Sequence, residues 1–186
     1  MVAVGSIAGC SDSSTSSDDA WAKIDTTTTG APIAVGAAPL LVEQIRPAIA
    51  ALEQELGGPQ QFFEVNATPT LVNLFVATEG ATSAIAYIYQ AGALEPPAAP
   101  QPASGPTFAA SELTFDETRV LANVVGSLPD STLRGFSAVG VDGGGVRYVV
   151  NVESALGGAF EVMVDPAGAI LGTNGQLTPA ATVPGS

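Results

Sequence analysis

The fold is decided by the stretch Asp142-Gly143-Gly144-Gly145-Val146-Arg147-Tyr148-Val149-Val150-Asn151-Val152-Glu153. Within it Val146, Tyr148, Val150 and Val152 share one face of an extended chain, and Arg147 and Asn151 share the other. Alternation with a period of two predicts a half-buried β-strand. The glycines before it predict a tight turn, because glycine adopts positive φ angles without steric cost. We therefore expect a β-hairpin in an antiparallel sheet.

A helix and further strands surround this hairpin. Thr114-Phe115-Asp116-Glu117 matches a capping box, in which the Thr hydroxyl and the Glu carboxylate accept hydrogen bonds from free amides at a helix start. The helix is expected to run to about Leu128, with Pro129 ending it. Strands are predicted at residues 134–141, 146–153, 159–164 and 169–171.

The first half of the chain shows the same order of elements. Residues 39–56 predict a helix that stops at Gly57-Gly58, and Pro47 predicts a kink or the true start of its second part. Strands are expected at 61–66, 70–78 and 83–90, with a turn at 79–82. Residues 71–75 align with 146–150 at an offset of 75.

The fold class predicted from these patterns is α+β. We expect two tandem units, each a helix followed by three antiparallel strands, with the helices packed on one face of the sheet. Two independent α+β segments are the alternative, and the sequence leaves open whether the halves form one domain or two.

The composition excludes several functions. The net charge of −13 arises from 18 acidic and 5 basic residues, which repels nucleic acids and anionic lipid headgroups. The chain has no His, and Cys10 is its one Cys. A His-based catalytic triad, a thiolate metal cluster and an internal disulfide are therefore excluded. We expect no enzyme, no metal and no cofactor.

Carboxylates are the remaining candidates for chemistry. Calcium could in principle be held by Asp142, Glu153, Glu161 and Asp165. These residues fall at predicted turns or on alternating strand positions, so we expect them to be ordinary solvent-exposed turn and strand residues. Glu153 and Glu161 could also face one another across a hairpin as an acid–base pair. Cross-strand ion pairs with Arg134 and Arg147 would explain the set without catalysis.

Aromatic residues are concentrated in the first half of the chain. Phe62, Phe75, Tyr87 and Tyr89 are the candidates for lining a ligand groove. Tyr87 and Tyr89 share one face of a predicted strand. Core packing is the ordinary interpretation, and a groove or cavity for an apolar ligand is the sharper one.

Ile7-Ala8-Gly9-Cys10 resembles the bacterial lipobox, an aliphatic residue and two small residues before a Cys. The resemblance implies a diacylglyceryl group on Cys10 and a lipid anchor on the extracytoplasmic face of the cell membrane. The polar run at 11–19 agrees, because serine-rich tethers after the Cys are typical of lipoproteins of the actinobacterial type. The pattern departs in residues 1–6, which lack the basic start and apolar segment of a signal peptide. Either the start lies further upstream or the motif is accidental.

Val164-Asp165-Pro166-Ala167-Gly168-Ala169-Ile170-Leu171 resembles the pattern valine-aspartate-x-x-glycine-x-x-leucine of PepSY-like α+β domains. The resemblance covers about residues 114–172. It implies a helix on a curved antiparallel sheet and an envelope-located binding or regulatory module. It does not imply a particular chemistry.

The chain divides into segments on these patterns. We predict a truncated signal with a lipobox at 1–10, a flexible tether at 11–37, a first α+β unit at 38–94, a proline-rich linker at 95–110, a second unit at 111–172 and a disordered tail at 173–186. The predicted function is a non-catalytic envelope lipoprotein that binds or scaffolds an envelope partner. A carrier of lipid or glycolipid and a PepSY-like peptidase-inhibitor or regulatory module are the alternatives.

Overall fold

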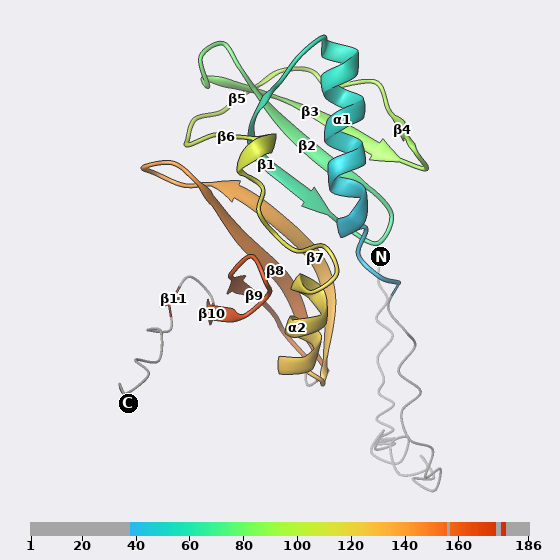
Figure 1. The fold of residues 1–186 in the computed structure, drawn as a ribbon, viewed down its shortest axis with the longest axis vertical. Coiled ribbons are helices and arrows are strands. Elements are labelled where there is room, and N and C mark those ends of the chain that lie inside the picture. Colours follow the sequence, from blue (N-terminus) through green and yellow to red (C-terminus); the bar gives the residue numbers. More distant parts are fainter. Residues whose placement is uncertain (1–37, 156, 174–175, 178–186) are drawn as a thin grey trace, which may run out of the picture. The chain divides into compact units, whose positions relative to one another are not determined.

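A computed structural model of the chain describes residues 38–155, 157–173 and 176–177 (Figure 1). Its helical elements are η2 (Val42–Gln44), α1 (Ile45–Leu56), η3 (Ala110–Glu112) and α2 (Val120–Ser127). Its strands are β1 (Gln61–Ala67), β2 (Val72–Thr78), β3 (Ser83–Gln90), β4 (Ala93–Leu94), β5 (Gln101–Pro102), β6 (Phe108–Ala109), β7 (Ser131–Gly140), β8 (Val146–Ser154), β9 (Ala159–Val164), β10 (Ile170–Thr173) and β11 (Gln176–Leu177).

All described strands belong to one antiparallel sheet. Its order is β11-β10-β9-β8-β7-β1-β2-β3-β4, with β5 beside β3 and β6 beside β1. The α+β class expected from the sequence is confirmed. The two halves meet where β1 pairs with β7, so the sheet runs through both of them. Separate tandem units are not evident in this continuous sheet.

Helix α1 buries one face against the sheet. Its buried residues Ile45, Ala48, Ile49 and Leu52 recur at helical spacing. The expected start at residue 39 was wrong, because the Leu41 amide donates to the Thr68 carbonyl and holds this segment against the β1–β2 turn. Pro47 lies in the first turn, where its missing amide costs no hydrogen bond. Gly57 ends the helix with a φ of 79°, as expected of a left-handed cap.

Helix α2 begins at Val120, later than the capping-box pattern predicts. The Asp116 carboxylate accepts hydrogen bonds from the amides of Thr118 and Arg119, at 3.0 and 3.1 Å. Thr114 does not cap the helix, because its hydroxyl lies 3.3 Å from the Tyr148 hydroxyl, to which its amide also donates. The Asp116 carboxylate therefore closes the turn that leads into α2, and the N-cap residue Arg119 makes no side-chain cap.

The sheet has one helix-covered face. Residues that alternate along the strands fill the core beneath α1 and α2, which both lie in front of the sheet in Figure 1. This core includes Phe62, Val65, Leu74, Tyr87, Phe136, Tyr148, Val150 and Val162. Burial of each such side chain contributes about 1.5–3 kcal/mol. The alternation predicted for residues 146–153 is confirmed by the burial of Tyr148, Val150 and Val152.

The proline-rich segment follows the edge of β3. The amides of Ala98 and Ala103 donate to the carbonyls of Ala86 and Thr82, at 2.9 and 3.1 Å. Gln101 and Pro102 form β5 against the start of β3. Because proline offers no amide for a further strand, this segment protects the sheet edge from pairing with another chain.

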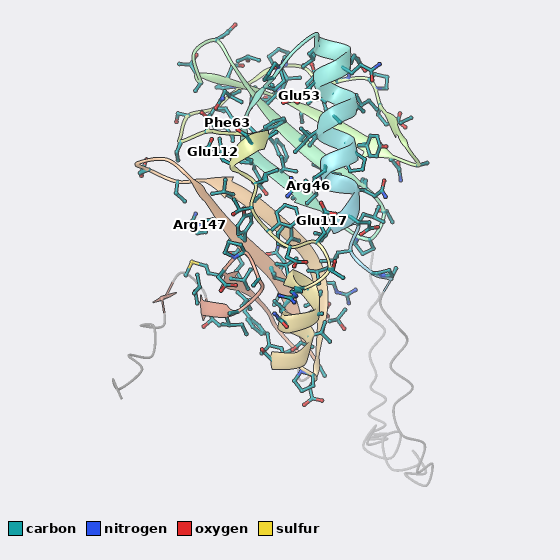
Figure 2. The ribbon with its side chains drawn as sticks, viewed as in Figure 1. Arg46, Glu53, Phe63, Glu112, Glu117 and Arg147 are labelled. Carbon is teal, nitrogen blue, oxygen red and sulfur yellow. The ribbon has the colours of Figure 1, made fainter. Side chains whose placement is uncertain are left out.

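Arg46 joins α1 to the segment that leads into α2. Its guanidinium forms an ion pair with Glu117 at 2.7 Å and donates to the Leu113 carbonyl at 3.1 Å (Figure 2). It also lies 5.4 Å from the ring centroid of Phe115. Phe115 in turn packs on Phe136, at 5.1 Å between ring centroids. Arg46 therefore connects the first half of the chain to the aromatic core of the second.

The turn between β9 and β10 is held against α2. The Asn123 side-chain amide donates to the Ala167 carbonyl at 2.7 Å, and the Asp116 amide donates to the Pro166 carbonyl at 2.8 Å. Gly168 has a φ of 90°, and a Cβ there would collide with the Val120 carbonyl. Only glycine satisfies both constraints.

We predict that Gly168→Ala destabilises the fold much more than Gly143→Ala. Both glycines have positive φ, but the space around Gly143 is open. The control, Gly143→Ala, should lower the free energy of unfolding by about 1 kcal/mol through backbone strain. Gly168→Ala should lower it by at least about 2 kcal/mol more, because of the collision. Urea unfolding followed by circular dichroism measures both. Equal midpoints for the two variants would contradict the packing of this turn on α2.

Candidate functional site

The candidate site is the face of the sheet opposite α1 and α2, here called the helix-free face. Strand alternation directs to it the residues that the helix-covered core leaves out. They include Asn73 and Phe75 on β2, Glu64 and Asn66 on β1, Ser137 and Val139 on β7, Arg147, Val149 and Asn151 on β8, and Glu161 and Met163 on β9. None of them belongs to the helix-covered core, although Ser137 and Met163 are buried, at 8% and 7% exposed.

A hydrogen-bonded polar cluster occupies the centre of this face. The Asn73 side-chain amide donates to Oδ1 of Asn66 at 2.7 Å, and the Asn66 amide donates to Oε1 of Glu64 at 3.1 Å. The Ser137 hydroxyl donates to the same Glu64 oxygen at 3.0 Å. These bonds hold four polar side chains from three adjacent strands in fixed orientations. We call Glu64, Asn66, Asn73 and Ser137 the central cluster.

The central cluster keeps free hydrogen-bonding capacity. Among the described residues, nothing donates to Oε2 of Glu64 or to Oδ1 of Asn73. Both side chains are half-buried, so these oxygens lie at the surface. Phe75 pairs directly with Glu64 across β1 and β2 and is also half-buried. An aromatic surface therefore borders the free acceptors.

A hollow of about 440 Å³ lies over β7, β8 and β9. It is lined by Arg134, Asn151, Val152, Ala159, Phe160 and Glu161. Asn151 pairs with Gly135, where an added Cβ would lie 3.2 Å from the Asn151 amide nitrogen. The missing side chain at Gly135 therefore leaves room for the Asn151 amide, which makes no hydrogen bond to any described residue.

The charged residues expected at this hairpin lie on the helix-free face. Arg134 forms an ion pair with Glu153 at 2.6 Å, as the cross-strand interpretation predicted. Glu153 pairs in register with Ala159, and Glu161 pairs with Asn151, so the two carboxylates occupy diagonal positions. Arg147 is exposed beside Val139 on the neighbouring strand. Because Glu153 is engaged by Arg134, the geometry favours ion pairing over a carboxylate acid–base pair.

The aromatic groove candidates separate between the two faces. Phe62, Tyr87 and Tyr89 are buried in the helix-covered core. Phe75 lies on the helix-free face, because it alternates with buried Leu74 on β2. The structure therefore brings three of the four candidates to one face and places the fourth on the other.

The calcium candidates are distributed over turns and strands. Asp165 accepts hydrogen bonds from the amides of Ala167 and Ala169, at 2.9 and 2.8 Å, which closes its own turn. Asp142 begins the glycine turn between β7 and β8. Across the described residues, no three acidic, Cys or His side chains gather closely enough to hold a metal ion.

The lipobox residues Ile7, Ala8, Gly9 and Cys10 lie outside the described residues. In the part that the structure covers, no helix has the length and apolar character needed to cross a membrane. The lipid anchor therefore rests on the sequence motif.

Sequence reasoning missed the central cluster. Alternation alone predicts that Glu64, Asn66 and Asn73 face solvent. Polar residues are ordinary at such positions, so the pattern does not indicate a function. The available signal is composition, because Asn is depleted in strands and here occurs twice in adjacent central ones. The approach of Ser137 depends on the pairing of β1 with β7, which the local pattern does not specify.

Comparisons of the chain with protein-family models, with curated proteins and with solved structures give no match. The arguments about function therefore rest on the residues and their geometry.

We predict that the Arg134–Glu153 pair contributes about 0.2–1 kcal/mol, because its side chains are 56% and 47% exposed. A double-mutant cycle of Arg134→Ala and Glu153→Ala by urea unfolding measures this coupling. It should shrink at about 1 M salt, where the screening length is only about 3 Å. A coupling of zero at low salt would mean that the guanidinium beside the hollow is not neutralised in solution.

Proposed function

We propose that this chain is a non-catalytic lipoprotein of the bacterial cell envelope, anchored through Cys10, whose helix-free face binds an envelope partner. The single observation that carries the binding role is the central cluster. Its four polar side chains are fixed by one another and still leave surface acceptors to which none of the described residues donates. Such preorganisation lowers the entropy lost on binding.

The lipid anchor is supported by the lipobox-like motif and the polar run that follows it. Residues 11–19 read Ser-Asp-Ser-Ser-Thr-Ser-Ser-Asp-Asp. A segment this polar suits a tether, which would give the binding face a reach of about 5–6 Å × √n for n residues. A non-catalytic role agrees with a sequence that lacks His and with the ion pairing of Glu153.

We also infer that the two halves descend from tandem α-β-β-β units with their helices on one face. Support comes from the register at the centre of the sheet. Asn66 pairs with Ser137, Val65 with Ala138 and Ala67 with Phe136. The pairing is antiparallel, which a half-turn between two equivalent strands requires.

The second strands of each half agree with this symmetry. With the half-turn axis placed at the Asn66–Ser137 pair, Ala67 is equivalent to Ala138, so their partners Val72 and Tyr148 correspond, and both are buried. This correspondence lies one residue beyond the sequence alignment at an offset of 75. At an offset of 75, buried Val72 would correspond to exposed Arg147. A shift of one residue exchanges the two faces of a strand, so the new correspondence matches buried residues to buried ones.

The two alternatives receive less support. A lipid or glycolipid carrier needs space between helices and sheet, but Phe62, Tyr87 and Tyr89 fill the core there. A PepSY-like regulatory module was suggested by residues 164–171. The contacts of that turn with α2 explain why these residues occur there, and no binding partner is needed to explain them.

We predict that Cys10→Ala abolishes lipid attachment. The variant and the parent chain are expressed in a bacterial host behind a functional secretion leader, and the cells are fed an alkyne fatty acid. The parent should carry the label and sediment with membranes, because the Cys10 sulfur would hold the diacylglyceryl group into which the fatty acid is incorporated. The variant should be unlabelled and soluble. Ser11→Ala, the neighbouring control, should behave as the parent. Equal labelling of parent and Cys10→Ala would contradict the anchor.

A further inference from the structure

We propose that the helix-free face binds an uncharged oligosaccharide, along a strip that runs from the central cluster on β1, β2 and β7 to the hollow over β7–β9. This inference rests on the proposed binding function and names its ligand class. It begins from two separated features of one face: the fixed polar cluster, and the hollow that holds the Asn151 amide.

The register places these features on one continuous path. Asn73, Asn66 and Ser137 are successive partners across β2, β1 and β7, and Val149 and Met163 continue the row onto β8 and β9. Ser137 and Met163 are buried, so the accessible part of the path runs over Asn73, Asn66 and Val149. The next row contains Gly135, Asn151 and Glu161. Neighbouring strands lie about 4.8 Å apart, so this path is long enough for several sugar units.

The polar groups on the path match the chemistry of a saccharide. Sugar hydroxyls donate and accept hydrogen bonds, and side-chain amides do the same. Oε2 of Glu64 and Oδ1 of Asn73 offer acceptors, and the Asn151 amide, which bonds to none of the described residues, offers both donors and an acceptor. Phe75 beside Glu64 provides a flat apolar surface for the C–H face of a sugar ring.

The charge on this face favours an uncharged ligand. The whole chain has a net charge of −13, which repels a polyanion. Two of the five basic residues, Arg134 and Arg147, nevertheless lie on the helix-free face. Arg134 is neutralised by Glu153, and Arg147 shares a row with Glu64 through Val139. With Glu161, the face carries two arginines against three carboxylates, so it holds no excess of positive charge that would select an anion.

The test is a titration of the full chain, residues 1–186, with neutral hexasaccharides followed by ¹H–¹⁵N nuclear magnetic resonance. The probes are cellohexaose, mannohexaose and chitohexaose, each raised to about 10 mM because a shallow face implies dissociation constants near the millimolar range. At least one probe should shift the side-chain amide signals of Asn66, Asn73 and Asn151 saturably. Hexagalacturonate, a charged probe of the same length, should not shift them.

Variants locate the site. Asn73→Ala and Asn151→Ala should each weaken binding about tenfold, because each removes hydrogen bonds at one end of the strip. Gln54→Ala removes an exposed amide from α1, on the other face of the sheet, and should bind as the parent does. Thermal unfolding confirms that each variant is folded. Asn151 makes no hydrogen bond within the described residues, so its variant should unfold with the parent.

Four outcomes would overturn the proposal. They are no saturable shift with any neutral probe, shifts confined to α1 and α2, equal binding of hexagalacturonate, and concentration-dependent shifts without sugar, which would assign the face to a second copy of the chain. None of these concerns Cys10. A chain that is lipidated in cells but binds no saccharide loses this inference and keeps its anchor.

Discussion

Antiparallel pairing between β1 and β7 is the contact on which the rest of the structure depends. It joins the last residues of β1, Glu64–Ala67, to residues 136–139 of the second half. Without it, each half would be a small sheet with an unpaired edge and little core of its own. With it, Phe62, Leu74, Phe136 and Val150 contribute to one core beneath both helices. The same pairing brings Ser137 within reach of Glu64 and so creates the central cluster.

Side-chain contacts outside the sheet reinforce this union. Arg46 on α1 holds Glu117 and the Leu113 carbonyl, which lie on the segment that leads into α2. In the β9–β10 turn, the backbone of Gly168 packs against Val120 at the start of α2. The helices are thus fixed to one face by polar contacts at their ends as well as by apolar packing. The opposite face is left to side chains that hydrogen-bond among themselves.

Local patterns in the sequence predict much of this fold. Strand-like runs placed β3 and β9 at their observed bounds, because clear turn signals border both runs. Helix starts were predicted less well. The segments before α1 and α2 are bound by partners distant in sequence, Thr68 and Tyr148, which compete with the local capping signals.

The candidate site was harder to predict than the fold. Ion pairing of Arg134 with Glu153 follows from a hairpin register and could be predicted. The central cluster needs three strands from both halves, so only the long-range pairing reveals it. Phe75 was singled out with Phe62, Tyr87 and Tyr89 by residue type, but alternation on β2 sends it to the other face.

The pairing of β1 with β7 can be measured directly by nuclear Overhauser effects in the labelled chain. An antiparallel register predicts close backbone proton contacts between Val65 and Ala138 and between Asn66 and Ser137. These contacts should persist on dilution and should be absent from spectra filtered for intermolecular contacts. Intact β1–β2 and β7–β8 contacts without any between β1 and β7 would show two separate sheets and would contradict the account.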